Sequence, residues 1–262
     1  MAKLTVADLQ QMKRDGKKIV ATIVYDYQMA QIMDRAGVDL LTVGDSVGPN
    51  MWGQPTHFEV TVDQMILACS AVTRGAQRAV VNCDMPFGPL QESAEAAVRA
   101  AIRLVKEAHA EVIKVDNAPA NLEAVKRIAG AGIPVWTQFG FSPQSSLANA
   151  AFDTATEETA KRYREKILRD ALDLEEAGAS MLDLTHVPDH SIYAEVVRTV
   201  KIPVLGGSSA AGPEADGRIS GFTYRAAQID RPGPGHGGDV AALIYKLAQQ
   251  YVEDVRAAKE KV

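Results

Sequence analysis

Short β-type runs alternate with helical patterns along almost the whole chain. The segments between the β-type runs carry apolar residues at helical spacing, and several begin at a capping residue such as Thr61 or Ser93 and end at a glycine. This alternation predicts parallel strands joined by helices. The β-type runs, of which the last is the weakest, span residues 17–26, 39–45, 78–84, 111–116, 133–138, 180–185, 202–207 and 217–224.

Chain length selects among the α/β architectures. At 262 residues, without a linker-like segment, the alternation fits one (β/α)8 TIM barrel of about 250 residues. Two doubly wound domains fit less well, and the GxGxxG turn of a Rossmann domain is absent. We therefore expect an α/β protein with a single barrel domain over residues 1–262. A final helix at about 238–260 would cover the barrel or dock on another subunit.

Composition and charge exclude several classes of protein. The formal net charge is -5, and Lys and Arg form no cluster of the kind that phosphate binding requires. The nearest candidate, "KRYREK" at 161–166, has the pattern of a solvated helix face. No apolar run is long enough to span a membrane, and the amino terminus lacks a signal-peptide core. We therefore expect a cytoplasmic protein that binds neither nucleic acid nor membranes.

Several of the expected strands end in or near an aspartate. In a TIM barrel the active site lies at the carboxyl ends of the strands, so these side chains should gather on one rim. Converging carboxylates repel one another unless a cation or a proton compensates them, and oxygen ligands without Cys or His favour a hard ion such as Mg²⁺. A single aspartate at a strand end is more often a helix cap, which is how we interpret Asp26. The aspartates are Asp26, Asp45, Asp84, Asp116 and Asp183.

Strand alternation indicates which side chains enter the barrel. In "EVIKVD", Lys114 and Asp116 share the inward face with Val112, and the residues between them face the helices. An inward lysine must be paired, and its expected partners are Asp116 and the carboxylate of a substrate. The same count places four further pairs on shared faces: Val43 with Asp45, Asn82 with Asp84, Trp136 with Gln138, and Asp183 with Thr185.

Six segments of the chain match the order and spacing of segments in a known enzyme family. They are "VYDYQMAQIMDRAGVDLLTVGDSVG", "TRGAQRAVVNCDMPFG", "EAHAEVIKVDN", "AGIPVWTQFGFSPQSS", "LEEAGASMLDLTHVP" and "IPVLGG". Between about Leu4 and Gly221 the chain thereby resembles the ketopantoate hydroxymethyltransferases, enzymes of pantothenate biosynthesis. The resemblance implies a (β/α)8 barrel related to isocitrate lyase and phosphoenolpyruvate mutase. It also implies a homo-oligomer, with the decamer that is common in the family as one form.

The resemblance further implies a reaction and a set of site residues. The family transfers a hydroxymethyl group from 5,10-methylenetetrahydrofolate to the third carbon of the 2-oxo acid 3-methyl-2-oxobutanoate, and Mg²⁺ stabilises the enolate that forms on the way. By resemblance Asp45 and Asp84 are metal ligands, and Asp116 supports the metal through water. Ser46 and Lys114 hold the carboxylate of the substrate. The implied partners are a small 2-oxo acid and a folate.

Three positions depart from the family pattern. Asp116 stands where the family has a glutamate, and Gln138 keeps a polar contact to the substrate in place of the histidine of the "GHLG" segment. Thr185 stands at the general-base glutamate of "LVLECVP", and threonine cannot serve as that base. Two residues of the same strand can replace it, namely Asp183 one layer deeper and His186 at the strand end. The altered site leaves open a different 2-oxo acid, a different one-carbon or aldehyde donor, or lost activity.

Three functions therefore remain open from the sequence. The first is an Mg²⁺-dependent hydroxymethyltransferase, or a divergent paralogue, that acts on a 2-oxo acid. The second is a metal-dependent carbon–carbon lyase or aldolase of the isocitrate lyase type, with a Schiff base on Lys114 as a variant. The third is a degenerate barrel that only binds a small acid or serves in assembly. In each, "PNMWGQPTHFEV" has the character of a lid, and Trp52, His57 and Phe58 are candidates for lining the pocket.

Overall fold

The computed structural model describes residues 2–140, 144, 157–185, 187, 191–207, 214–220, 224, 240 and 246. Contacts between Cα atoms divide the chain into two units, residues 1–220 and 221–262. The described strands all belong to the first unit. Apart from Val240 and Lys246, the helix expected at about 238–260 lies outside the described residues. The interpretation of residues 1–262 as a single domain therefore stays a prediction.

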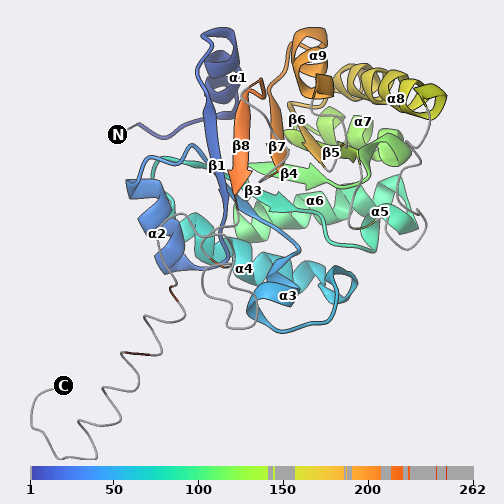
Figure 1. The fold of residues 1–262 in the computed structure, drawn as a ribbon. Coiled ribbons are helices and arrows are strands. Elements are labelled where there is room, and N and C mark those ends of the chain that lie inside the picture. The colour runs from blue at the N-terminus through green and yellow to red at the C-terminus, as the bar shows by residue number, and fades with distance from the viewer. Residues whose placement is uncertain are drawn as a thin grey trace, which may run out of the picture. The chain divides into compact units, whose positions relative to one another are not determined.

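Eight parallel strands form a closed barrel in the first unit (Figure 1). Each strand pairs with its neighbour in the sequence, and β8 closes the barrel against β1. The predicted α/β class and (β/α)8 TIM barrel are confirmed, including the weak last strand. The strands are β1 (Ile19–Ile23), β2 (Leu40–Val43), β3 (Val80–Asp84), β4 (Val112–Val115), β5 (Val135–Gly140), β6 (Met181–Thr185), β7 (Val204–Gly207) and β8 (Gly217–Ser220).

Helices occupy most connections and begin where capping residues predict. Thr61 and Ser93 cap α4 and α6, and Asp26 caps α2 by accepting a hydrogen bond from the Met29 N–H at 2.8 Å. None of the described helices is long and apolar enough to cross a membrane. The helices are α1 (Val6–Arg14), α2 (Tyr27–Arg35), α3 (Val47–Met51), α4 (Val62–Gly75), α5 (Pro89–Glu92), α6 (Ala94–Ala108), α7 (Leu122–Gly130), α8 (Glu157–Glu176) and α9 (Ser191–Thr199), with 3₁₀ turns η1 (His57–Glu59) and η2 (Ala118–Asn121).

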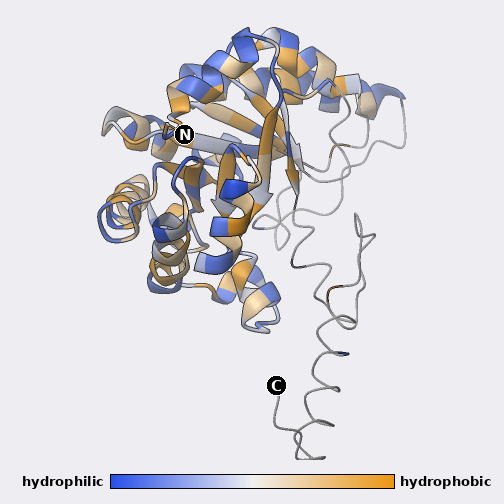
Figure 2. Ribbon diagram, turned by 90° about the vertical axis from the view of Figure 1, so that its left-hand side faces the viewer, coloured by the Kyte–Doolittle hydropathy of each residue, from blue (hydrophilic) through white to orange (hydrophobic). Residues whose placement is uncertain are grey.

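The barrel interior is apolar at the amino-terminal end of the strands. Leu9 of α1 packs into this cluster, and Trp136 of β5 is its largest fully buried side chain. Figure 2 shows the hydrophobic residues concentrated on the strands and the hydrophilic ones on the outer sides of the helices. Polar side chains occupy the interior one layer higher, toward the carboxyl ends. The strand residues of the cluster are Ile19, Ala21, Leu40, Val80, Val112, Trp136, Met181, Leu205 and Ile219.

The pairing register determines which side chains enter the barrel. Thr42 pairs with Asn82, whose Nδ2 donates to the Thr42 hydroxyl at 2.6 Å in the interior. Val43 pairs with Cys83 on the opposite, helix-facing side. The prediction that Val43 shares a face with Asp45 is wrong, because β2 ends at Val43 and Asp45 lies in the turn that follows. Strand alternation no longer applies after the last paired residue.

Candidate active site

Three aspartates lie at the carboxyl ends of adjacent strands. Asp84 is the last residue of β3, Asp116 directly follows β4, and Asp45 lies in the turn after β2. A Cβ atom at Gly44 would lie 2.8 Å from the Ser46 hydroxyl and 3.4 Å from Asp84 Oδ2. Glycine therefore allows the close approach of the β2 and β3 ends. The structure thus brings the three predicted metal-site residues to one part of the rim.

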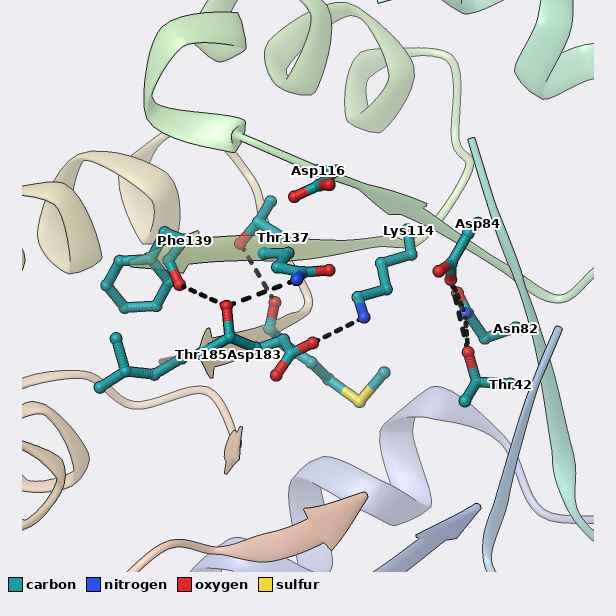
Figure 3. Close-up of polar contacts among 12 residues, drawn as sticks. Thr42, Asn82, Asp84, Lys114, Asp116, Thr137, Phe139, Asp183 and Thr185 are labelled. Carbon is teal, nitrogen blue, oxygen red and sulfur yellow. Dashed lines mark hydrogen bonds and ion pairs between the residues drawn. The ribbon is translucent and has the colours of Figure 1, made fainter. Parts of the chain in front are cut away.

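Two polar side chains of the barrel interior hold Asp84. Asn82 Nδ2 donates to Asp84 Oδ1 at 2.9 Å, and Thr42 Oγ1 donates to the same oxygen at 3.4 Å (Figure 3). Burial raises the pKa of Asp84 to about 7, with Lys114 opposing the rise and Asp45 adding to it. Asp84 is therefore only partly ionised at neutral pH, and a nearby cation would favour its charged form.

Both carboxylate oxygens of Asp45 have hydrogen-bond partners. Asp45 Oδ1 lies 3.1 Å from His57 Nδ1, and Asp45 Oδ2 accepts from Gln144 Nε2 at 2.9 Å. Gln144 also connects to Asp116, because its backbone N–H donates to Asp116 Oδ2 at 3.2 Å. The hydrogen bond with Asp45 raises the pKa of His57, although burial opposes the rise. His57 is therefore more readily protonated here than in water.

Lys114 of β4 crosses the barrel interior and forms an ion pair with Asp183 of β6. The distance from Lys114 Nζ to Asp183 Oδ2 is 2.6 Å, and Nζ lies 4.8 Å from the ring centroid of Trp136. Figure 3 shows the lysine side chain between Asp183 and Asp84. Burial alone would lower the pKa of Lys114, but Asp183, Asp84 and Asp116 raise it above the usual lysine range. Asp183, rather than the expected Asp116, is the direct partner, because the long side chain reaches past β5 to the next strand, β6.

Thr185 and Gln138 are joined near the ends of β6 and β5. Gln138 Nε2 lies 3.4 Å from Thr185 Oγ1, which donates to the Phe139 carbonyl oxygen at 3.3 Å. The two strands approach closely at Gly140, where φ is +95° and a Cβ atom would collide with the Thr185 carbonyl oxygen. The hydroxyl of Thr185 is thus engaged with β5. His186 lies outside the described residues, so its role as a base stays a prediction.

Ser46 belongs to a hydrogen-bonded chain with Tyr25 and Asn50. The Tyr25 hydroxyl lies 2.7 Å from Ser46 Oγ, and Asn50 Nδ2 donates to the Tyr25 oxygen at 2.9 Å. Between Tyr25 and Ser46 either hydroxyl can be the donor. Burial raises the pKa of Tyr25 to about 12, which keeps the phenol protonated. The hydrogen bond with Tyr25 therefore orients the Ser46 hydroxyl.

The predicted lid residues differ in their contacts. His57 contacts Asp45, whereas Phe58 packs edge-on against Phe87 with ring centroids 4.9 Å apart. Trp52 is 39% exposed. His57 is thus hydrogen-bonded to a predicted metal-site residue.

The donor set fits a hard divalent cation that has few protein ligands. Among the described residues, no group of three or more His, Cys, Asp or Glu side chains is arranged to hold one metal ion. Mg²⁺ typically binds one or two carboxylates and keeps several waters or substrate oxygens. Asp45 and Asp84 supply two carboxylates, and because burial is what raises the pKa of Asp84, a bound cation would stabilise its charged form.

Sequence reasoning missed Tyr25, Asn50 and Gln144. Tyr25 and Gln144 each come shortly after a strand, β1 and β5 respectively, where a barrel places its active site. The position after a strand led us to the aspartates. The same criterion, applied to uncharged polar residues, would also have identified Tyr25 and Gln144. Asn50 lies within α3 and carries no such signal.

Solved structures share the fold at low sequence identity. A 2,3-dimethylmalate lyase, a member of the PEP mutase/isocitrate lyase superfamily, is 13% identical with a TM-score of 0.65, covering 99% of this chain and 90% of that chain. A phosphonopyruvate hydrolase in complex with oxalate and Mg²⁺ is 13% identical with a TM-score of 0.61, covering 98% of this chain and 100% of that chain. At such identity the similarity establishes the barrel fold alone.

Sequence relatives are much closer. A 3-methyl-2-oxobutanoate hydroxymethyltransferase of Bacteroides fragilis is 40% identical over 217 residues, which cover 83% of this chain and 78% of that protein. The enzyme of the same name from Chlorobaculum parvum is 38% identical over 261 residues, which cover 97% and 92%. The model of the ketopantoate hydroxymethyltransferase family matches residues 3–259. The chain therefore belongs to the ketopantoate hydroxymethyltransferase family of transferase enzymes.

Proposed function

We propose that the chain transfers a hydroxymethyl group from 5,10-methylenetetrahydrofolate to the third carbon of a 2-oxo acid, 3-methyl-2-oxobutanoate or a close relative. Family membership over nearly the whole chain supports this reaction class. The observation that carries the proposal is the gathering of carboxylates beside the buried Lys114 on one rim of the barrel. Such a rim provides a cation site together with a positive charge for an anionic substrate.

Asp45 and Asp84 would hold Mg²⁺, and Asp116 would support it through water. When bound, the ion would stabilise the negative charge that develops on the keto oxygen of the substrate as the neighbouring carbon loses its proton. Asn82 and Thr42 orient the Asp84 carboxylate, since both donate to its Oδ1. Hydrogen bonds to a ligating carboxylate of this kind typically strengthen metal binding.

Ser46 and Lys114 would bind the carboxylate of the substrate. The hydrogen bond with Tyr25, which itself accepts from Asn50, would orient the Ser46 hydroxyl toward the ligand. An ammonium group has three donors, and Lys114 therefore retains donors beyond the one directed at Asp183. This use of Ser46 and Lys114 fits a small anion such as a 2-oxo acid.

Gln138 would provide a further polar contact to the substrate. Its 3.4 Å hydrogen bond to Thr185 is long, so a ligand can replace it at small cost. Trp136 fills the barrel beneath this level and is wholly buried. The space above it therefore favours a small 2-oxo acid over a larger branched one.

Asp183 is the base that we propose. A substrate carboxylate on Lys114 would lie close to Asp183, because the two side chains are in contact. The same carboxylate would share the positive charge of Lys114, which raises the basicity of Asp183 and favours removal of the proton from the third carbon. His186 is the alternative base, and Thr185 would take no proton.

The transfer step then balances without a further cofactor. The one-carbon unit forms one bond to the third carbon of the acid and one to the oxygen of a water molecule, and both of its carbon–nitrogen bonds to the folate break. The proton taken from the third carbon by Asp183 and one proton of the water balance the two folate nitrogens, directly or through solvent. Release of its proton returns the Asp183 carboxylate to its starting state.

Deuterium exchange at the third carbon separates proton removal from transfer. In D₂O, with 3-methyl-2-oxobutanoate or smaller 2-oxo acids, we expect exchange that requires Mg²⁺ but not folate. Asp183→Asn should abolish exchange while metal binding persists, and an unchanged exchange rate would remove Asp183 as the base. Cleavage to a shorter product without folate would favour the lyase or aldolase alternative. Absence of exchange with every acid would favour a degenerate acid-binding barrel.

A further inference from the structure

Gln144 connects the carboxyl ends of three strands. It follows β5, and only 5% of its surface is exposed. Its Nε2 donates to Asp45 Oδ2 at 2.9 Å and to the Met85 carbonyl oxygen at 3.0 Å. Its backbone N–H donates to Asp116 Oδ2 at 3.2 Å. These partners follow β2, β3 and β4, so one residue ties together the rim that carries the predicted metal site.

The partners of the Gln144 amide determine its orientation. A carboxylate and a carbonyl oxygen face Nε2, and both groups only accept hydrogen bonds. The reversed amide would place its oxygen against two oxygens, so the nitrogen must face them. The other end of the amide, Oε1, is buried and has no hydrogen-bond partner among the described residues. An unsatisfied buried oxygen destabilises the folded protein, so a donor ligand would be favoured there.

We propose that Gln144 is a positioning residue for the divalent cation. Its side-chain N–H groups hold the Asp45 carboxylate, its backbone N–H holds Asp116, and its Oε1 accepts a hydrogen bond from a water of the bound ion. This inference rests on the proposed function, because it assumes a cation at Asp45 and Asp84. A neutral residue thus orients two acidic side chains, Asp45 through its side chain and Asp116 through its backbone.

The location of Asp45 explains why such a residue is needed. Asp45 lies in a turn, so strand pairing does not fix its side chain, and its Oδ1 is within reach of His57. A positively charged partner at Oδ2 would hold the carboxylate but would also compete with the cation. The amide of Gln144 holds it without adding positive charge. Ligands oriented in advance by such partners bind metal more tightly.

Mn²⁺ binding measured by electron paramagnetic resonance tests the proposal without substrate. Mn²⁺ accepts the same oxygen ligands as Mg²⁺. Gln144→Met keeps the side-chain length and removes its donors and its acceptor, while the backbone N–H remains. We expect Mn²⁺ affinity to fall about 10- to 100-fold. Gln144→Asn, whose amide is too short to reach both Asp45 and Met85, should also weaken binding, and it serves if the Met variant does not fold.

Gln10→Met is the matched control. Gln10 Nε2 donates to the Ser180 carbonyl oxygen at 3.1 Å, just before β6 begins and thus at the opposite end of the barrel. This variant should bind Mn²⁺ like the unmodified protein, and circular dichroism verifies the fold of each variant. A folded Gln144→Met protein with unchanged Mn²⁺ affinity overturns the inference and leaves the metal site standing. Failure of the unmodified protein to bind Mn²⁺ overturns the metal site itself.

Discussion

Replacing Lys114 should lower the free energy of unfolding more than replacing Asp183, its partner in the buried ion pair. The side chains are only 9% and 1% exposed and meet at 2.6 Å. Removal of one partner of a buried pair costs about 3–5 kcal/mol, because the other charge stays in the interior. In Asp183→Asn, the lysine keeps the favourable charges of Asp84 and Asp116, so we expect a loss of about 3 kcal/mol.

Lys114→Met should cause a loss of stability at the upper end of the range of about 3–5 kcal/mol. The variant leaves the carboxylates of Asp183, Asp84 and Asp116 without the ammonium whose positive charge attracts them. It also loses the contact between the ammonium and the Trp136 ring, which contributes about 0.5–2 kcal/mol. We therefore expect a loss of about 5 kcal/mol in the free energy of unfolding.

Urea unfolding of the metal-free protein at pH 7 and one protein concentration measures both losses. The double variant Lys114→Met with Asp183→Leu removes both charges of the pair at similar volume but still leaves Asp84 and Asp116 without the ammonium, so it should lose less stability than Lys114→Met alone. The reasoning is refuted if Asp183→Asn costs more than Lys114→Met, or if both cost less than about 1 kcal/mol.

Three further predictions concern pH, substrate binding and specificity. The pKa of Asp84 is raised to about 7, so protonated Asp84 stabilises the metal-free folded protein at low pH, and this stabilisation is lost as the pH rises through 7. Mg²⁺ must displace the same proton. Calorimetry should therefore show the affinity for Mg²⁺ falling about tenfold per pH unit below pH 7. A pH-independent affinity would contradict this. Tyr25→Phe removes one hydrogen bond to Ser46 and should raise KM for the 2-oxo acid about 5- to 10-fold with unchanged Mg²⁺ affinity; an unchanged KM would show that Ser46 needs no orientation. Thr185→Glu should shift the kcat/KM ratio toward 3-methyl-2-oxobutanoate, and a constant ratio would argue against the position's role in specificity.

The fold could be predicted because its signals are local. Seven of the eight strands lie within a short β-type run, as β4 (Val112–Val115) lies within residues 111–116 and β6 (Met181–Thr185) within 180–185, and β5 (Val135–Gly140) extends two residues beyond its run of 133–138. Capping residues mark the helix starts in the same local way. The error at Val43 came from an element boundary, since β2 ends there and the face of the next residues follows from the turn.

The aspartates on the rim could be predicted from the same local signal, but their partners could not. Lys114 and Asp183 belong to β4 and β6, which are not neighbours in the sheet. They meet because β4 and β6 both pair with β5 and the long lysine side chain reaches across that strand, and no periodicity of the sequence encodes that contact. Gln144 reaches β2 and β4 from beyond β5, along a path that the strand pattern does not determine.

The charge of the rim links the cation to the substrate. Four aspartates surround one buried lysine there, and they are Asp45, Asp84, Asp116 and Asp183. Even with Asp84 partly protonated, this surface is negative at neutral pH, so it would repel the carboxylate of a 2-oxo acid. Lys114 cannot offset the repulsion alone, because Asp183 already contacts its ammonium at 2.6 Å. A divalent cation at Asp45 and Asp84 would offset most of this negative charge and place a positive charge directly beside the substrate carboxylate, so the repulsion would weaken only then. Charge, more than shape, would therefore make the cation bind before the substrate.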